Sequence, residues 1–340
     1  MNLQFLSAAI PALPPAESGR DGQVLGGARL GALAASGGPE WPWQGIAAPL
    51  LGGRHDAVEE IWRSDLPCTA GEFEGIAWRR AGSLLYGVIE LAEDGFAAAP
   101  TATPLHMASR EAYRRIFRLL ASQGLPQLWR VWNYLGQINQ ESHGLERYRQ
   151  FNIGRQEAFL EFARQATGNV PAACAIGLAG GPLSIAFLAG AQAAVPVENP
   201  RQVSAYNYPP EYGPRSPTFS RAALVYPPGQ EILFVSGTAS IVGHQTVHLG
   251  DVAGQCRESM VNIAAVVDAA NRLCRSPAYC LNELSYRVYL RHAADFPEIR
   301  EILAELTGGE AGIVYLQADI CRHDLLLEIE AMASHTLGVA

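Results

Sequence analysis

The 340-residue sequence predicts an α+β protein that contains two tandem domains, each a mixed sheet covered by helices. The main observation is an order of elements (strand, helix, strand, helix, strand, strand) that occurs twice along the chain. Short fragments support this duplication, because RVWNYL at 130–135 resembles YRVYL at 286–290 and GPLSIAFLAG at 181–190 resembles HDLLLEIEAM at 323–332. Hydrophobic residues make up 49% of the chain and charged residues 17%, so material for a large core is available.

The first domain is expected at residues 71–195. Before it, residues 1–70 are rich in Gly, Pro and Ala and show weak periodicity, which predicts a covering segment without a core of its own. Within the domain, runs rich in aromatic and branched residues predict strands, and 3.6-residue periodicity predicts helices. The predicted elements are a strand at 84–91, a helix at 109–123, a strand at 130–135 and a helix at about 145–167.

An apolar run closes the first domain. Residues 169–197 carry no charge and are numerous enough to span a bilayer. However, Gly180, Gly181 and Pro182 interrupt the run at its middle. This interruption favours two buried strands joined by a turn, and we expect no membrane span.

The second domain is expected at residues 221–340, after a bridge at 196–220. The bridge is rich in Pro, Tyr and Arg, so its composition is not that of a simple linker. The predicted elements of the second domain are strands at 231–236, 284–290, 312–318 and 323–331, and helices at 251–272 and 296–306.

All twenty-five basic side chains are arginines, and the chain contains no lysine. This composition excludes enzymes that form a Schiff base on lysine, and also phosphate-binding loops of the Walker A type. The net charge of −8 argues against nucleic acid or an anionic membrane surface as a partner. Arginine is well suited to two-pronged contacts with carboxylates.

No metal or nucleotide cofactor is expected. The six cysteines lack zinc-ribbon spacing, and His244 and His248 are separated by residues that indicate a turn before a helix capped by Asp251. The glycine-rich GLAGGP at 177–182 joins two predicted strands and lacks the helix of a dinucleotide site. The first twelve residues have no basic region typical of an export signal, so we expect reduced thiols and a cytoplasmic protein.

An acid pair lies in the last predicted strand. Alternation along LLLEIEA at 325–331 places Glu328 and Glu330 on the same face. Burying two acids together is costly and suggests a purpose, although an edge strand could also turn them toward water.

The second half resembles the RidA (YjgF/UK114) family of small α+β domains. The similar segments are FVSGTASI at 234–241, GDVAGQCRESMVNIAAVVDAA at 250–270 and YLQADICRHDLLLEIEAMA at 315–333. The resemblance implies two tandem RidA/YjgF-like (chorismate-mutase-like) domains. RidA-like domains usually assemble as trimers, so a monomer and a homotrimer both stay open.

A narrower resemblance covers most of residues 130–333. The segments similar to the chorismatase family are RVWNYLGQIN at 130–139, GLERYRQFNIGR at 144–155, VPVENPRQVSAYNYPPEYGPRSPTFSRA at 195–222, which contains the bridge, and SGTASIVGHQTVHLGD at 236–251. The resemblance implies an enzyme that cleaves the enolpyruvyl ether of chorismate and releases pyruvate. The other product in this family is a hydroxybenzoate or a dihydroxycyclohexadiene carboxylate.

The chorismatase resemblance also implies roles for three residues. Glu328 corresponds to the catalytic acid, which would protonate the terminal methylene carbon of the substrate. Cys321 and Gly237 correspond to the pair found in members that form hydroxybenzoate, whereas two alanines mark the hydrolytic members. The expected product is therefore 3-hydroxybenzoate, with 4-hydroxybenzoate as a second product to be tested and the dihydrodiol as the alternative.

The two carboxylates of chorismate call for arginines. Arg147 and Arg155 are eight residues apart and can share a helix face, and Arg215 lies in the stiff YGPRSP segment. Tyr206 and Tyr208, near Arg215, could donate hydrogen bonds to the substrate. Gln317 is a further candidate donor, and it lies in the predicted strand at 312–318.

Two other functions stay open on the same scaffold. The first is an imine or enamine deaminase of the RidA kind. In that family an arginine that holds the substrate lies four residues before a glutamine, but that position is Ile313 here. The second is a non-catalytic protein that binds a small ligand.

Overall fold

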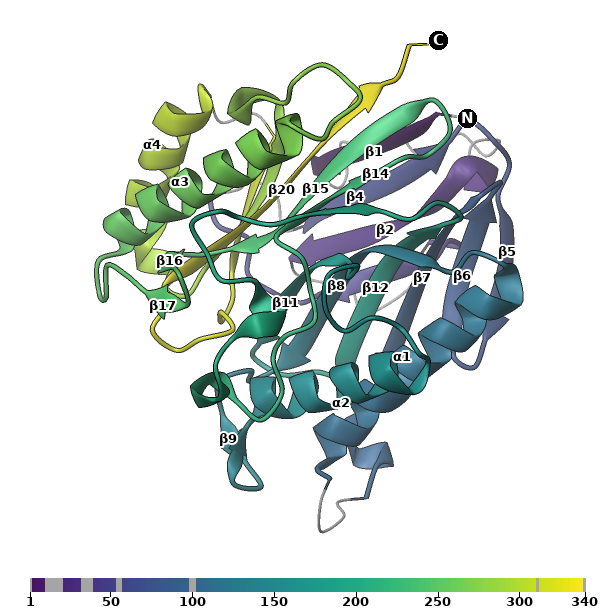
Figure 1. Ribbon diagram of the computed structural model, residues 1–340, viewed down its shortest axis with the longest axis horizontal. Helices are drawn as coiled ribbons and strands as arrows, with labels where there is room; N and C mark the ends of the chain where they lie inside the picture. The colour runs from purple at the N-terminus through teal and green to yellow at the C-terminus, as the bar shows by residue number, and fades with distance from the viewer. Residues whose placement is uncertain are drawn as a thin grey trace.

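Three β-sheets enclose one apolar interior, and two pairs of helices lie on the outside (Figure 1). The structure is a computed structural model that describes residues 2–9, 21–31, 39–52, 57–97, 102–309 and 312–338. Each pair of helices covers the outer face of one six-stranded sheet (Figure 1). The prediction of an α+β chain is confirmed.

The first six-stranded sheet has the strand order β11-β8-β12-β7-β6-β5. In it β8 and β11 are parallel, and the other neighbours are antiparallel. Its elements are β5 (Thr69–Phe73), β6 (Ile76–Ala81), β7 (Leu84–Leu91), α1 (Pro104–Gln123), β8 (Gln127–Gly136), α2 (Arg147–Glu161), β11 (Ala172–Leu178) and β12 (Leu183–Gly190). A small hairpin, β9 (Glu141–Ser142) with β10 (Leu145–Glu146), precedes α2.

The second six-stranded sheet repeats the arrangement of the first. Its order is β13-β14-β15-β20-β18-β19, with β18 and β19 parallel and the other neighbours antiparallel. Its elements are β13 (Val195–Val197), β14 (Ala222–Val225), β15 (Gln230–Thr238), β16 (Ile241–Val242), β17 (Gln245–Thr246), α3 (Val252–Asn271), β18 (Ser285–Leu290), α4 (Phe296–Thr307), β19 (Ile313–Gln317) and β20 (Leu327–Thr336). Matching positions in the two sheets are filled by elements in the same chain order, so the predicted duplication is confirmed.

Helix boundaries follow local chemistry. Thr103 accepts a hydrogen bond from the backbone of His106, which starts α1 earlier than predicted, and Gly124 ends it in the left-handed conformation. Asp251 caps α3 as predicted, since its carboxylate accepts from the backbone of Gly254. The predicted helix at 145–167 is shorter in the structure, where α2 ends at Glu161.

The uncharged run at 169–197 forms two buried strands, β11 and β12, joined by a turn at 179–182, and its last three residues form β13 of the second six-stranded sheet. The two strands do not pair with each other, because β8 lies between them. No helix in the described parts of the chain has the length and apolar character needed to cross a membrane.

The N-terminal residues form a sheet of their own, which the sequence did not predict. It contains β1 (Leu3–Ala9), β2 (Val24–Gly31), β3 (Trp43–Ile46) and β4 (Ala57–Ser64) in the order β1-β4-β2-β3. β2 and β3 are parallel, and the other neighbours are antiparallel. This is the pattern of the four strands at the end of each larger sheet that carries the parallel pair, β7-β12-β8-β11 and β15-β20-β18-β19. The N-terminal sheet is therefore a third copy of this strand arrangement, without an α-helix in its described residues.

The inner faces of all three sheets share one core. Three aromatic rings meet there, Trp62 from the N-terminal sheet, Trp132 from the first repeat and Phe234 from the second repeat. The ring centroid of Phe234 lies 5.7 Å from that of Trp62 and 6.3 Å from that of Trp132. Separate apolar clusters lie under α1 and α2 and under α3 and α4. The N-terminal residues therefore complete the central core.

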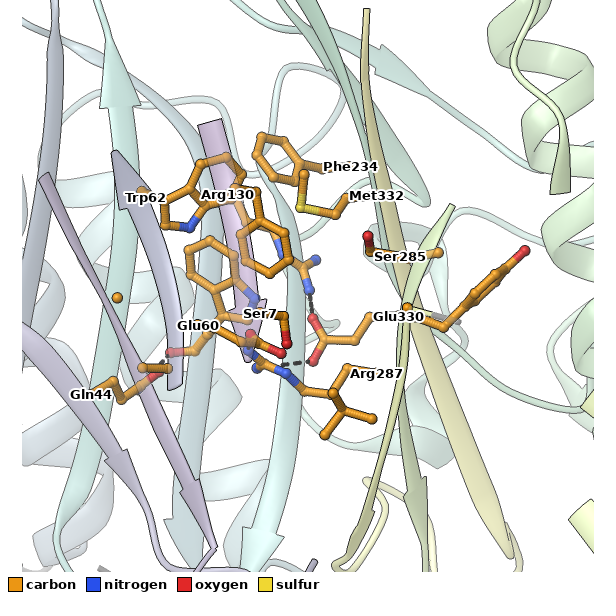
Figure 2. Close-up of a pocket in the computed structure, with 18 of the residues that line it drawn as sticks. Ser7, Gln44, Glu60, Trp62, Arg130, Phe234, Ser285, Arg287, Glu330 and Met332 are labelled. Atoms are coloured by element: carbon orange, nitrogen blue, oxygen red, sulfur yellow. Dashed lines mark hydrogen bonds and ion pairs between the residues drawn. The ribbon is translucent and has the colours of Figure 1, made fainter. Parts of the chain in front are cut away.

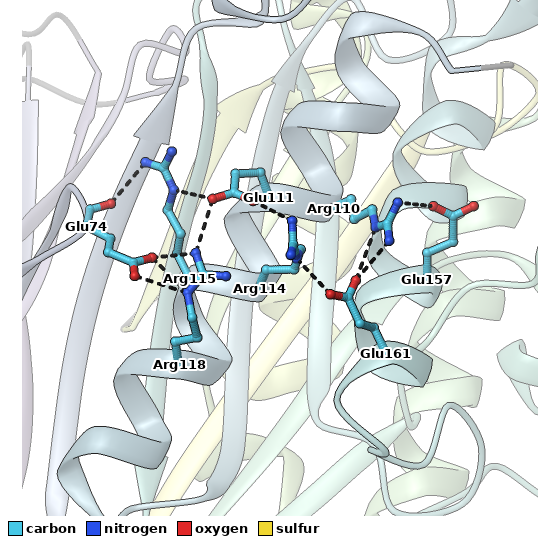
Figure 3. A network of polar contacts seen from close by, with 8 residues as sticks. All are labelled: Glu74, Arg110, Glu111, Arg114, Arg115, Arg118, Glu157 and Glu161. Carbon is cyan, nitrogen blue, oxygen red and sulfur yellow. Dashed lines mark hydrogen bonds and ion pairs between the residues drawn. The ribbon is translucent and has the colours of Figure 1, made fainter. Parts of the chain in front are cut away.

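Arginine–glutamate pairs tie the outer helices together (Figure 3). Arg110 and Arg114 on α1 both reach Glu161 on α2, at 3.0 Å. Arg118 reaches Glu74, in the turn between β5 and β6. These side chains are partly exposed, so each pair contributes only about 0–1 kcal/mol.

Candidate functional site

A cavity lies where the first repeat meets the second, between β11 on one side and β15 and β20 on the other. Its empty volume is about 1070 Å³, including the space at its open mouth. The bridge at 196–220 and the loop after β19 close it from the outside. The bridge is thus part of the cavity wall, in line with its unusual composition.

Glu328 projects from β20 into this cavity and is only 3% exposed. Burial raises its pKa to about 8, and the nearby charge of Glu330 adds to the rise. Arg130, Arg221 and a hydrogen bond with Cys321 act in the opposite direction. Glu328 is therefore a mostly protonated carboxylic acid at neutral pH, as an acid catalyst requires.

Gly237, near the end of β15, leaves the space that the Glu328 carboxyl group occupies. A Cβ atom at this position would lie 1.8 Å from Oε1 of Glu328 and 2.6 Å from its Cδ. No side chain fits at such distances, so the glycine permits the conformation of the acid.

Cys321 lies beside Glu328 in the cavity wall. Burial raises the pKa of its thiol to about 12, and the Glu328 charge adds to the rise. The Cys174 thiol, on β11 in the same wall, also has a pKa well above its usual value because it is buried. Both residues are neutral thiols, which contribute shape and weak hydrogen bonds and not a thiolate nucleophile.

Arg155 on α2 brings a buried positive charge to the cavity. Its side chain is 1% exposed, donates to Oδ1 of Asn152 at 2.8 Å and lies 5.0 Å from the ring centre of Phe151. Its Nε has no hydrogen-bond partner, and it forms no ion pair among the described residues. A buried guanidinium without a carboxylate favours an anionic ligand.

Two further arginines line the opposite part of the cavity, and the sequence did not single them out. Arg221 donates to the Tyr208 hydroxyl at 2.8 Å, and its Nε has no partner. Arg322 lies 4.0 Å from the ring centre of Tyr212 and 5.0 Å from that of Tyr208. Both arginines lie at the edges of segments that the sequence marked, directly after the bridge and after Cys321, but only the fold brings them together.

Five of the predicted site residues line the cavity: Glu328, Cys321, Gly237, Arg155 and Tyr208. The other four lie elsewhere. Arg147 forms a two-pronged ion pair with Glu93 and also donates to the backbone of Gly136.

Arg215, Tyr206 and Gln317 do not line the cavity either. Arg215 is exposed and Tyr206 is half-buried in the bridge. Gln317 lies at the end of β19, where its side chain donates to the backbone of Arg291 at 3.4 Å.

The described residues contain no group of three His, Cys, Asp or Glu side chains that could hold a metal ion. His244 instead contacts the Tyr212 hydroxyl at 3.1 Å, beside the cavity. His248 lies 3.6 Å from Glu258. The described residues that line the cavity include the buried acid Glu328, two neutral thiols and three guanidinium groups.

Sequence comparisons identify the relatives of this chain. Residues 60–189 match the family described as "Chorismatase FkbO/Hyg5-like, N-terminal". A chorismatase of Streptomyces rapamycinicus is 42% identical over 286 residues, which cover 82% of this chain and 83% of that protein. The chain belongs to the chorismatase family.

Two other chorismatase-family comparisons agree. A 3-hydroxybenzoate synthase of Streptomyces hygroscopicus is 39% identical over 284 residues, covering 80% of each protein. A crystal structure of a chorismatase superposes with a TM-score of 0.84 at 34% identity, covering 98% of both chains. The family resemblance seen in the sequence is confirmed, and the fold is that of a chorismatase.

Proposed function

We propose that this chain cleaves chorismate, releases pyruvate and forms 3-hydroxybenzoate. The observation that carries the proposal is Glu328, a buried acid whose pKa is raised to about 8, in a cavity with unpaired arginines. The names of its relatives, chorismatase and 3-hydroxybenzoate synthase, support the same substrate and product.

The proposed chemistry needs only a proton donor and a shaped cavity. Glu328 transfers its proton to the terminal methylene carbon of the enolpyruvyl group, which leaves an oxocarbenium ion. In place of water, the hydroxyl on the neighbouring ring carbon attacks the ring carbon that carries the ether. The hydroxyl loses its proton as the bond between that carbon and the ether oxygen breaks, so pyruvate leaves and an epoxide spans the two ring carbons. The bond between the epoxide oxygen and its original ring carbon then breaks, and the oxygen takes up a proton. Loss of a ring proton restores aromaticity. One chorismate thus gives one pyruvate and one hydroxybenzoate, and no water is consumed.

The arginines would bind the two carboxylates of the substrate. Arg155 lies on one side of the cavity, and Arg221 and Arg322 lie on the other. Each of the three guanidinium groups has one buried nitrogen without a hydrogen-bond partner, so each can donate to a ligand, although the charge of Glu198 also acts on Arg221. This assignment keeps Arg155 from the sequence prediction and replaces Arg147 and Arg215.

The function is tested by incubating the purified protein with chorismate. Pyruvate is measured with a coupled lactate dehydrogenase assay, and the ring product is identified by chromatography against standards. Equal amounts of pyruvate and 3-hydroxybenzoate are expected. A dihydroxycyclohexadiene carboxylate would indicate the hydrolytic reaction instead, and the absence of pyruvate would refute the proposal.

A pair of arginine variants distinguishes the two sets of candidate ligand residues. Arg155→Gln is expected to raise KM for chorismate about tenfold or more, because a charged two-pronged contact is lost. Arg215→Gln, on the exposed bridge, is expected to leave KM within about twofold of the wild-type value. The opposite result in steady-state kinetics would return the binding role to Arg215.

A substitution at Cys321 tests the product assignment. Cys321→Ala leaves space beside Glu328 that a water molecule can enter, so part of the product is expected to change from hydroxybenzoate to the dihydrodiol. Chromatography of the ring products measures the ratio. An unchanged ratio would remove Cys321 from the control of the product.

We also propose that the enzyme acts in the cytoplasm, as a monomer or a homotrimer. Size-exclusion chromatography with light scattering distinguishes these two states. A dimer would contradict both.

A further inference from the structure

Four buried charged residues connect the three sheets at the centre of the molecule (Figure 2). They are Glu60 on β4, Arg130 on β8, Arg287 on β18 and Glu330 on β20. Arg287 pairs with Glu60 and lies 3.6 Å from Glu330, and Arg130 pairs with Glu330 from the other side. This central charge cluster borders a second cavity, distinct from the one that contains Glu328.

The contacts of Glu330 hold it in the ionised form. Arg130 and the hydroxyl of Tyr289 donate hydrogen bonds to its carboxylate, and Arg287 adds a second positive charge. Burial by itself would raise the pKa of Glu330, but the two arginines and these hydrogen bonds outweigh burial and lower it. A negative charge is therefore fixed at this position of β20.

Glu328 is the neighbour of Glu330 on the same face of β20, two residues earlier in the chain. The spacing of a strand puts their Cα atoms roughly 7 Å apart. Both side chains are buried, at 3% and 5% exposure, so little water screens one charge from the other. Among the described residues Glu328 has no ion-pair partner, whereas Glu330 has two.

We propose that Glu330 is a positioning residue that keeps the proton on Glu328. Of two buried carboxylates on one strand face, the one clamped by arginines carries the charge, and the other one carries the proton. The charge of Glu330 thereby adds to the effect of burial in keeping Glu328 protonated, without touching the substrate. The catalytic part of this inference rests on the proposed function.

Other groups also face Glu328. Glu330 lies on the same strand, and Cys321 lies in the loop before it. Arg130 comes from β8, Cys174 from β11 and Tyr148 from α2, and Arg221 directly precedes β14. Burial is the largest cause that raises the pKa of Glu328 and the charge of Glu330 adds to it, whereas Arg130 and Arg221 lower this pKa and favour the carboxylate. Removing Glu330 and removing Arg130 should therefore have opposite effects on Glu328.

The test is the pH dependence of kcat/KM for pyruvate release. Wild-type activity depends on protonated Glu328, so it should fall as the pH rises through about 8. In Glu330→Gln this alkaline limb should move down by about one pH unit, which is about a tenfold loss relative to wild type above the limb. In Arg130→Gln the limb should move to higher pH.

Glu60→Gln is the matched control. It also breaks an ion pair of the central charge cluster, with Arg287, and should cost similar thermal stability. Its charge is not one of those that dominate the pKa of Glu328, so its alkaline limb should stay in place. A purely structural role of Glu330 would make Glu330→Gln and Glu60→Gln behave alike.

An unmoved or upward-shifted limb in Glu330→Gln would overturn the inference. If Glu330→Gln does not fold, Arg130→Gln provides the test. An alkaline limb of Arg130→Gln that stays in place or moves to lower pH would also overturn the inference. An infrared titration without substrate also follows the protonation of Glu328. Subtracting the spectrum of Glu328→Gln from that of the wild type isolates the carboxylic acid band of Glu328. Should the wild type fail to cleave chorismate, the proposed function fails, and the infrared shift between wild type and Glu330→Gln still decides this inference.

Discussion

Replacing Glu328 with Gln should lower kcat for pyruvate release by about three orders of magnitude, because the amide cannot protonate the methylene carbon. The same substitution should stabilise the protein at alkaline pH. The pKa of Glu328 is about 8 in the folded state, above its ordinary value of 4.5. Between these values the unfolded chain releases the proton while the folded one keeps it, so wild-type stability falls as the pH rises.

The stability gain of Glu328→Gln should reach roughly 2–4 kcal/mol at pH 8 and vanish near pH 4. Urea denaturation at the two pH values measures it, and the coupled pyruvate assay measures the rate. Together the two results separate a lost acid from a misfolded protein. Near-normal turnover, or an equal stability change at both pH values, would contradict the role of Glu328 as a buried neutral acid.

Gly237→Ala should displace the catalytic acid. The added methyl group would lie 1.8 Å from Oε1 of Glu328, so the carboxyl group has to rotate or the strands have to separate. The backbone of Gly237 is not in the left-handed region, so alanine itself is acceptable to the chain. We expect kcat to fall by about 10- to 100-fold at a cost of about 1–3 kcal/mol in stability.

The control for Gly237→Ala is Gly180→Ala. Gly180 lies in the turn between β11 and β12, away from Glu328, and a Cβ atom there meets nothing within 4 Å. Steady-state kinetics and chromatography of the ring products compare the two variants. If Gly237→Ala keeps wild-type kcat, then the carboxyl group has room that the structure does not show.

The shared face of the two acids could be predicted from a local pattern, whereas the roles of Glu328, Cys321 and Gly237 were implied by the resemblance to the chorismatase family. Alternation along β20 placed Glu328 and Glu330 on one face, and the structure buries both. The pattern could not show that the two acids have different partners. Arg130 and Arg287 come from β8 and β18, and only the assembled sheets bring them to Glu330.

The arginine ligands show the limit of helix periodicity. Arg147 and Arg155 lie on one helix, but eight residues correspond to a rotation of about 80° beyond two full turns. Arg147 is the first residue of α2, and its guanidinium group forms an ion pair with Glu93, which begins the short 3-10 helix Glu93–Gly95. No spacing within the helix could predict that long-range ion pair.

The N-terminal sheet could not be predicted, for a different reason. At Gly26 a Cβ atom would lie 2.1 Å from the ring of Tyr86, and at Gly27 it would lie 2.0 Å from the carbonyl oxygen of Glu60. Gly26 is needed because Tyr86 of the first six-stranded sheet packs against it, and Gly27 because the backbone of the neighbouring strand β4 approaches closely beside a register shift. These glycines interrupt the alternation that normally indicates a strand. The weak periodicity of this segment thus reflects tight contacts rather than a lack of structure.

Because one chain supplies all three sheets, equivalent positions are free to differ. The pairing registers place Glu328 opposite Tyr289 on β18, Ser184 opposite Tyr134 on β8, and Val58 opposite Leu30 on β2. An acid thus occupies only one of these three equivalent positions. In a symmetric ring of identical chains, the same glutamate would be buried three times and its destabilising effect would be tripled. Internal repetition confines that effect to a single position and leaves the two equivalent positions, Ser184 and Val58, without a buried acid.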